Sequence, residues 1–314
     1  MPKADHPFTG VSEDDLSAIF ESQDYVAEDE LVTTVFLALR LGRPLLVEGD
    51  PGAGKTELAK VLAAGFETEL VRLQCYEGLT AENALYEWNY AKQLLAIQSD
   101  EGSVNADRSV FDEEYLLERP LLRAVRGDGD YPPVLLVDEI DRADEEFEAL
   151  LLELLSDFQL SIPEFGTIEA TKPPVVVITS NRTRGLSDAL KRRCLYLHLE
   201  PPSPEKERAI VRRKVPELSE MATVDLCAVT ARLREEPLRK RPGVAETLDW
   251  AQAITILRGR DDSENQLLSP AEIERTVGCL LKEAEDIEHV DEAILASLLD
   301  AAESARLEMG DGDG

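Results

Sequence analysis

The chain alternates short apolar runs with longer segments whose apolar residues recur at helical spacing. Residues 28–41 follow the helical pattern, and residues 45–48 are a short apolar run that leads into a Gly-rich turn. A second helical segment, 55–65, begins directly after that turn. The order strand, turn, helix predicts one repeat unit of a parallel sheet.

The same alternation continues to about residue 200. Residues 134–137 are apolar throughout, as in a parallel strand buried on both faces, and residues 175–179 predict another buried strand. Residues 158–169 alternate around Gly166 and predict a β-hairpin. The pattern predicts further strands at 70–74 and 195–199. It also predicts helices at 13–20, at the end of the stretch 76–98, at 113–125 and at 145–156.

Strand patterns stop after the proline-rich residues 201–204, and residues 205–306 follow helical patterns almost throughout. We therefore predict an α/β fold with a parallel sheet, followed by a smaller all-helical domain. The predicted parts are a loose N-terminal segment at 1–25, the α/β domain at 26–203, the helical domain at 204–306 and a disordered tail at 307–314.

Composition adds a strong acidic excess. The 314 residues contain 33 Lys+Arg against 64 Asp+Glu, a net charge of −31, and 43% are hydrophobic. The apolar content is enough for a sizeable core. A surface that repels polyanions argues against a general nucleic-acid binder. A solvated surface explains the charge most simply, and a salt-adapted host is the alternative.

The cysteines and the N-terminus indicate the compartment. The four cysteines include no CxxC pair and there are three histidines, so neither a disulfide framework nor a zinc site is predicted. The first residues lack the layout of a signal peptide. There is also no apolar run of about 18 residues that could span a membrane. We expect a cytoplasmic protein.

The Gly-rich turn fits the phosphate-binding pattern G-x-x-x-x-G-K-[ST] at every position and lies between a strand and a helix. Its backbone amides and the helix N-terminus favour phosphate oxygens. Lys55 would contact the β and γ phosphates of ATP, and Thr56 would hold Mg²⁺. The motif consists of Gly49, Asp50, Pro51, Gly52, Ala53, Gly54, Lys55 and Thr56.

Two acids and an amide follow the buried strands. Asp138 and Glu139 follow the apolar run 134–137, and Asn181 ends the stretch that begins with the strand 175–179. Ligands of open α/β sheets bind at this end of the strands. Asp138 would hold Mg²⁺ through water, Glu139 would activate the attacking water, and Asn181 would orient it. The alternatives are acids that cap the next helix and an asparagine that forms a turn.

Two adjacent arginines, Arg192 and Arg193, lie in the stretch 186–194 of an otherwise acidic protein. An arginine placed beside the γ phosphate of a neighbouring subunit would stabilise the charge of the transition state. The alternative is salt bridging on an acidic surface. If the catalytic arginine comes from a neighbour, assembly should depend on nucleotide.

These motifs together resemble the AAA+ ATPases, and in detail the MoxR family and its CoxD-like branch, which is associated with carbon-monoxide dehydrogenase maturation. The resemblance covers about residues 25–260. It is carried by the blocks GDPGAGKTELAK, LLVDEIDRADEEFEALLLELLSDFQLSIPEFGTI, VVVITSNRTRGLSDALKRRCLY, LYEWNYAKQLL and RPGVAETLDWA.

The resemblance implies a P-loop AAA+ core with a helical lid, and a ring, usually a hexamer, with ATP at the subunit interfaces. It implies an insertion around 76–90 and places the hairpin 158–169 before the sensor strand. Arg193 would be the arginine finger with Arg192 alongside, and Arg241 would be the second sensor in the lid. Such ATPases are chaperone-like, often act with a von Willebrand factor A-domain partner, and help assemble metal centres in a client enzyme.

Five large side chains cluster in fifteen residues: Tyr76, Leu79, Tyr86, Trp88 and Tyr90. They would either grip a client polypeptide or pack on the core, and we favour the core for most of them. Residues 77–80 are the better candidate for an exposed loop. Two other functions stay open besides an ATP-driven remodeller. One is a nucleotide-gated scaffold that needs no turnover, and the other is a DNA-directed motor or GTP-dependent restriction subunit, which the net charge disfavours.

Overall fold

The computed structural model describes residues 7–100, 111–127, 129–163, 165–259 and 267–311. The chain forms two compact units. The first holds Ala27–Gly49, Lys55–Leu199 and the described N-terminal residues up to Gln23. The second holds Asp24–Val26, Asp50–Gly54 and the part of the chain from Glu200 onward. The domain boundaries drawn from the sequence stay predictions.

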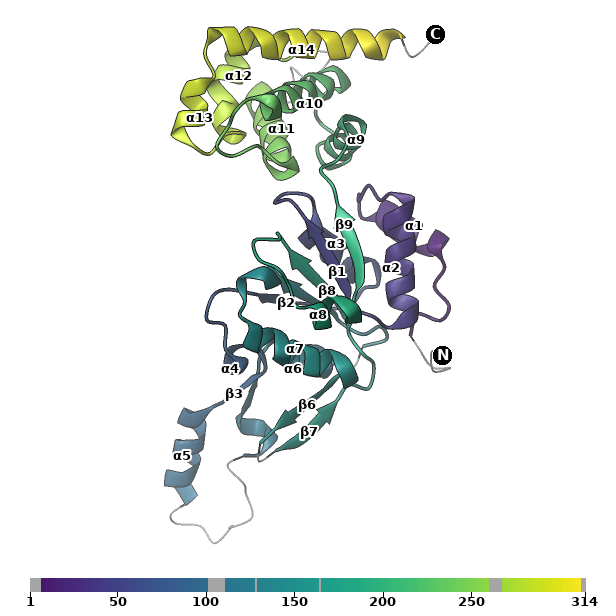
Figure 1. The fold of residues 1–314 in the computed structure, drawn as a ribbon, viewed down its shortest axis with the longest axis vertical. Helices are drawn as coiled ribbons and strands as arrows, with labels where there is room; N and C mark the ends of the chain where they lie inside the picture. The colour runs from purple at the N-terminus through teal and green to yellow at the C-terminus, as the bar shows by residue number, and fades with distance from the viewer. Residues whose placement is uncertain (1–6, 101–110, 128, 164, 260–266, 312–314) are drawn as a thin grey trace. The chain divides into compact units, whose positions relative to one another are not determined.

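A five-stranded sheet is the centre of the first unit (Figure 1). Its strand order is β2-β5-β8-β1-β9, and every neighbouring pair is parallel. This confirms the α/β fold and all five strands expected from the sequence. The strands are β1 (Leu45–Gly49), β2 (Leu70–Gln74), β5 (Val134–Asp138), β8 (Val175–Ser180) and β9 (Leu195–Leu199).

Helices cover both faces of this sheet, because successive strand residues point to opposite sides and both sides are apolar. Leu46 and Ile178 share a buried core with α6 and α7. Leu45 and Val177, of the opposite parity, face α2 and α3. The helices are α1 (Glu13–Ser22), α2 (Asp29–Leu41), α3 (Lys55–Gly65), α4 (Ala81–Ala84), α5 (Tyr90–Asp100), α6 (Pro120–Val125), α7 (Glu145–Asp157) and α8 (Asp188–Arg193).

Two antiparallel ribbons are attached to this core. The expected hairpin is present as β6 (Gln159–Ile162) and β7 (Gly166–Glu169). The second ribbon pairs β3 (Tyr86–Trp88) with β4 (Leu116–Glu118) and was not expected. The single helix predicted over 113–125 was wrong. A 3-10 turn, Glu113–Tyr115, precedes β4, and α6 begins only at Pro120, which fits the first turn of a helix.

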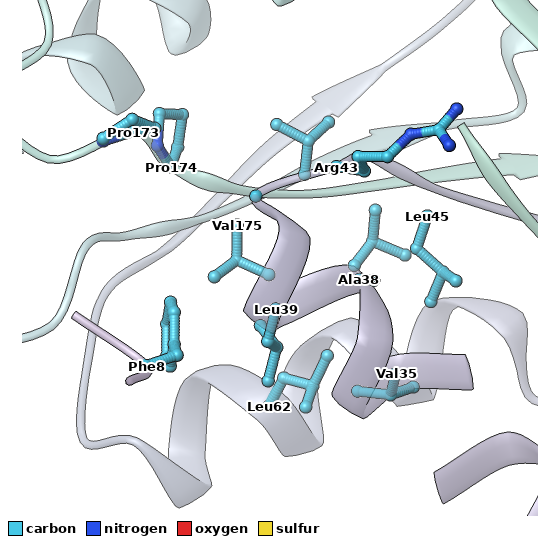
Figure 2. A pocket seen from close by; sticks show the side chains of 13 residues that line it. Phe8, Val35, Ala38, Leu39, Arg43, Leu45, Leu62, Pro173, Pro174 and Val175 are labelled. Atoms are coloured by element: carbon cyan, nitrogen blue, oxygen red, sulfur yellow. The ribbon is translucent and has the colours of Figure 1, made fainter. Parts of the chain in front are cut away.

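The described N-terminal residues are not a loose segment. Phe8 is 2% exposed and stacks on Tyr131 at 5.5 Å between ring centroids, with Phe66 edge-on at 5.1 Å. Figure 2 shows the Phe8 side chain beside a small pocket that Val35, Leu39 and Leu62 also line. Burial of an aromatic ring against α2 and α3 therefore ties the beginning of the chain to the core.

The second unit is helical in its described residues, as predicted. Its core is built around Trp250, whose Nε1 donates a 2.6 Å hydrogen bond to Thr276. The expected tail from residue 307 was wrong as far as Asp311, because the last helix continues to that residue. The helices are α9 (Pro204–Lys214), α10 (Glu220–Glu235), α11 (Val244–Arg258), α12 (Pro270–Thr276), α13 (Ala284–His289) and α14 (Glu292–Asp311), with a 3-10 turn at Val277–Cys279.

Candidate nucleotide-binding and catalytic site

The candidate site lies at the carboxyl ends of three neighbouring strands. β8 lies between β5 and β1, so the ends of the three strands share one edge of the sheet. β1 ends at Gly49, β5 at Asp138 and β8 at Ser180. This edge is where open α/β sheets bind ligands. The strand pairing therefore brings motifs together that are far apart in the sequence.

The phosphate-binding motif forms a turn with its glycines in the left-handed region. Gly52 has φ +84° and Gly54 has φ +89°, and a Cβ on Gly54 would meet nothing within 4 Å. Lys55 is the first residue of α3 and is 7% exposed, and its Nζ donates a 2.8 Å hydrogen bond to the Gly49 carbonyl. An open glycine turn with a buried ammonium group fits a polyphosphate.

Thr56 and Asp138 meet as the sequence predicts. The Thr56 hydroxyl donates a 3.1 Å hydrogen bond to Asp138 Oδ1, and Asp138 is 3% exposed. Thr179 donates to the same oxygen at 2.6 Å, while Arg72 donates to Oδ2 from Nε at 3.1 Å and from Nη2 at 2.6 Å. A carboxylate and a hydroxyl are the hard oxygen ligands that Mg²⁺ prefers, so this pair fits that ion.

Glu139 is held in the left-handed region at φ +56°, with its N–H donating a 2.9 Å hydrogen bond to the Thr179 hydroxyl. Its carboxylate accepts from Gln74 Nε2 at 3.0 Å and from Asn181 Nδ2 at 3.4 Å, and it pairs with Arg142 Nε at 3.0 Å. The structure thus brings Glu139 and Asn181 together. Gln74 and Arg142 are contacts that the sequence motifs did not indicate.

Asp141 is a residue whose role was missed. It is 3% exposed and accepts hydrogen bonds from the backbone N–H of Asn181 at 3.1 Å, the backbone N–H of Thr183 at 2.9 Å and the Thr183 hydroxyl at 2.5 Å. Burial raises the pKa of Asp141, but the bonds from Thr183 and Asn181 outweigh it and leave the pKa below its ordinary value. Asp141 therefore joins the turn after β5 to the loop after β8.

The alternative of acids capping a helix is correct only for Asp144, which caps α7 through a 2.8 Å bond from the Phe147 amide. Further along α7, the buried Glu148 pairs with Arg184 at 2.6 Å and accepts a 3.0 Å bond from the Ser187 amide. Ser187 in turn caps α8. A buried carboxylate thus fixes the start of the helix that carries the arginine pair.

The arginine pair lies at the end of α8. Arg43 fastens this end, donating to the carbonyls of Arg193 at 3.1 Å, Arg192 at 2.5 Å and Cys194 at 3.2 Å. The Arg193 side chain donates to Ser156 Oγ at 3.1 Å. The exposed Arg192 guanidinium has no hydrogen-bond or ion-pair partner among the described residues. The role of the pair toward a neighbouring subunit stays a prediction.

The basic run before α11 belongs to the second unit. The buried carboxylate of Asp286 accepts from the amides of Arg239 and Lys240 at 2.9 and 3.1 Å, which fixes the loop that carries Arg241. Arg241 is exposed and precedes the helix instead of opening it. The role of Arg241 as second sensor stays a prediction.

Also within the second unit, the phosphate turn packs closely on the start of α11. A Cβ on Gly52 would lie 3.3 Å from the Gly243 Cα, and a Cβ on Gly243 would lie 3.3 Å from the Pro51 carbonyl oxygen. Only a small residue allows this approach of two backbones. Gly243 is therefore a packing position, a role that its place in the sequence did not indicate.

The aromatic segment divides between core and surface. Leu79 is 4% exposed, although residues 77–80 were the better candidate for an exposed loop. The expectation of burial is confirmed for Trp88, at 7% exposed. It was wrong for Tyr76 and Tyr90, which are 46% and 63% exposed. These two lie outside the β3–β4 ribbon, whose pairing buries Trp88 against Phe111 at 5.4 Å between ring centroids.

All four cysteines are free thiols in the structure. Three of the four free thiols are buried and Cys279 is half-buried. Burial raises the pKa of Cys75, Cys194 and Cys227 to about 12. Among the described residues, no His, Cys, Asp and Glu side chains group as a metal site. No helix in the described ranges is long and apolar enough to cross a bilayer.

Comparisons with known proteins agree with this geometry. Residues 44–194, just under half of the chain, match the family model described as AAA domain (dynein-related subfamily). Over 181 residues the chain is 30% identical to the uncharacterized protein YehL of Escherichia coli (strain K12), covering 55% of this chain and 45% of YehL.

Two further relatives have descriptive names. The denitrification regulatory protein NirQ of Pseudomonas aeruginosa is 24% identical over 181 residues, covering 55% of this chain and 61% of NirQ. Chaperone MoxR1 of Mycobacterium tuberculosis is 26% identical over 203 residues, covering 62% and 47%. The matched part thus spans less than two thirds of each relative. Residues 44–194 match an AAA domain, and the chain has the AAA+ P-loop fold with a helical C-terminal region.

Proposed function

We propose that this AAA-domain protein is a MoxR-type ATPase that hydrolyses ATP to ADP and phosphate with Mg²⁺. The observation that carries the proposal is the convergence of four predicted side chains at one edge of the sheet. Thr56 lies 3.1 Å from Asp138, and Asn181 lies 3.4 Å from Glu139. The match of residues 44–194 to the AAA domain supports the same conclusion.

Each residue has a separate role in this proposal. The amides of the glycine turn and the Lys55 ammonium group would hold the β and γ phosphates, and Thr56 and Asp138 would hold Mg²⁺, the latter through water. Bound Mg²⁺ supplies positive charge that offsets the phosphate oxygens. Glu139 would accept a proton from the attacking water, and Asn181 would orient the same water.

The remaining charge would come from a second copy of the chain. Arg193 with Arg192 alongside would reach the γ phosphate of a neighbouring subunit, in a ring that the family resemblance makes a hexamer. The exposed position of Arg192 at the end of the fastened helix α8 supports this arrangement. Arg241 would add a contact from the lid as the second sensor.

We further propose a chaperone-like role in which ATP turnover assembles or activates a metalloenzyme, together with a von Willebrand factor A-domain partner. Likeness to Chaperone MoxR1 and to the denitrification regulatory protein NirQ supports this role. A molybdenum-containing carbon-monoxide dehydrogenase is the client that the CoxD-like motifs suggest, and a cytoplasmic location follows from that role. The alternative is a nucleotide-gated scaffold. The Glu139 carboxylate is bound by Gln74 and Arg142, which would suit a protein that needs no turnover.

Substitution of Glu139→Gln separates turnover from binding. We expect the variant to bind a fluorescent ADP analogue as the wild type does and to release phosphate at least about 100-fold more slowly, as for loss of a general base. Glu146→Gln, an exposed acid on α7, is the matched control and should change neither value. An unchanged phosphate-release rate in Glu139→Gln would remove Glu139 from the mechanism.

A further inference from the structure

Asp138 is surrounded by hydrogen-bond donors on both of its carboxylate oxygens. Oδ1 accepts from Thr56 at 3.1 Å and Thr179 at 2.6 Å, and Oδ2 accepts two bonds from the Arg72 guanidinium. Of these donors only Arg72 is charged. Burying a carboxylate without a positive partner costs free energy, and Arg72 supplies the positive charge that offsets this cost for Asp138.

Arg72 is able to leave this contact. Its side chain is 51% exposed, whereas that of Asp138 is 4% exposed, so the guanidinium reaches the acid from the solvent side. Arg72 lies on β2, opposite Leu136 of β5, and does not belong to the phosphate loop. A guanidinium at the rim of the site exchanges a protein contact for water more easily than a buried one would.

A divalent cation held by Thr56 and, through water, by Asp138 would bring two positive charges close to the carboxylate that Arg72 already neutralises. Like charges that share one carboxylate repel each other. We propose that Arg72 is a built-in competitor of the divalent cation, occupying Asp138 until the cation arrives and then giving way. This proposal rests on the proposed function, because it assumes that the cation of the ATPase binds at Thr56 and Asp138.

The same guanidinium is connected to the catalytic base. Arg72 Nη2 donates to Gln74 Oε1 at 2.6 Å, and Gln74 Nε2 donates to Glu139 Oε2 at 3.0 Å. Gln74 lies two residues further along β2, on the same face of the strand. When Arg72 leaves Asp138, Gln74 loses or changes the partner that orients its amide. Cation binding at Asp138 is thereby transmitted to Glu139.

The first test measures Mn²⁺ binding to the full chain with saturating ADP, by the electron paramagnetic resonance signal of free Mn²⁺. Arg72→Gln removes the competing charge, so its apparent Kd for Mn²⁺ should fall at least about threefold. Arg72→Lys keeps the charge and should stay within about twofold of the wild type. Arg123→Gln also removes one positive charge from the first unit, where Arg123 pairs with Glu69, and should leave the Kd unchanged.

The second test does not depend on the folding of Arg72→Gln, in which Asp138 has lost its positive partner. In wild-type protein with ¹⁵N-labelled arginine, the Arg72 Nε–H resonance, assigned by its absence in Arg72→Lys, should move from an ion-paired to a solvated position when Mg²⁺ and ADP are added. A Mn²⁺ Kd in Arg72→Gln equal to or weaker than that of the wild type, or an Arg72 resonance that stays ion-paired, would overturn the competition. Wild-type protein that takes up neither ADP nor Mn²⁺ would instead overturn the proposed function.

Discussion

Asp141 offers the sharpest test of how the site is held together. The change Asp141→Asn keeps the size of the side chain but turns one acceptor oxygen into an amide that faces donors. The wild-type carboxylate accepts three hydrogen bonds. One comes from the backbone N–H of Asn181, and two come from the backbone N–H and the hydroxyl of Thr183. A hydrogen bond to a charged group contributes about 1.5–3 kcal/mol, and one acceptor is retained, so we expect a loss of about 2–4 kcal/mol.

The assay is urea unfolding of the full chain, followed by tryptophan fluorescence. The chain has two tryptophans, Trp88 in the first unit and Trp250 in the second, so a Trp250→Phe background leaves Trp88 as the reporter of the unit that holds Asp141. Asp144→Asn is the matched control. Asp144 makes one capping bond that asparagine also makes, and it should cost less than about 0.5 kcal/mol.

The pH dependence has a definite sign. Hydrogen bonds lower the pKa of folded Asp141 below its ordinary value of 3.8, despite burial, which raises it. The carboxylate therefore stabilises the fold fully above pH 3.8 and loses this effect as the pH falls through the lower, folded pKa. The difference between wild type and Asp141→Asn should be constant near neutral pH and shrink below about pH 4. Equal unfolding free energies for the Asp141 and Asp144 variants at pH 7 would refute the reasoning.

Three further outcomes are expected. Lys55→Ala should weaken binding of a fluorescent ADP analogue at least about tenfold, measured by anisotropy, because it removes the buried ammonium group beside the phosphate turn. The pKa of Glu272 is lowered from 4.5 to about 2, chiefly by its hydrogen bond with Arg258. Glu272→Gln should therefore destabilise the second unit by about 1–2 kcal/mol at pH 7, after allowance for solvent screening, and by progressively less from pH 4.5 down to about 2, as the Trp250 unfolding transition would report. Iodoacetamide at pH 8 should modify Cys279 in the folded protein and the other three thiols only after unfolding, as peptide mass mapping would show. These three are Cys75, Cys194 and Cys227, whose pKa is raised to about 12.

The sequence predicted the parts of the site that depend on local order. A glycine turn between a strand and a helix fixes the place of Lys55 and Thr56 without knowledge of the rest of the chain. The ends of buried parallel strands meet at one edge, so Asp138, Glu139 and Asn181 were correctly expected to lie near each other. These inferences needed only residue spacing and the period of the apolar pattern.

The remaining features depend on contacts between distant segments. Arg72 and Gln74 read as ordinary polar positions of a half-buried strand, and their role appears only once β2 pairs with β5. Asp141 looks like one acid among several near a helix start, and only the position of Thr183 identifies it. Likewise, β4 was mistaken for the beginning of a helix because its pairing with β3 cannot be seen in a window of a few residues.

The most direct test of the central proposal, an ATPase completed by a neighbouring copy, is phosphate release from mixed variants. Glu139→Gln and Arg193→Ala should each be nearly inactive alone. In a ring with head-to-tail interfaces, each site combines Glu139 of one subunit with Arg193 of its neighbour. In an equal mixture of the two variants, both residues are intact in roughly a quarter of the sites, so activity should return to about that fraction of wild type. A mixture that exchanges subunits, shown by fluorescence energy transfer between labelled variants, and yet stays as inactive as its components would contradict the account.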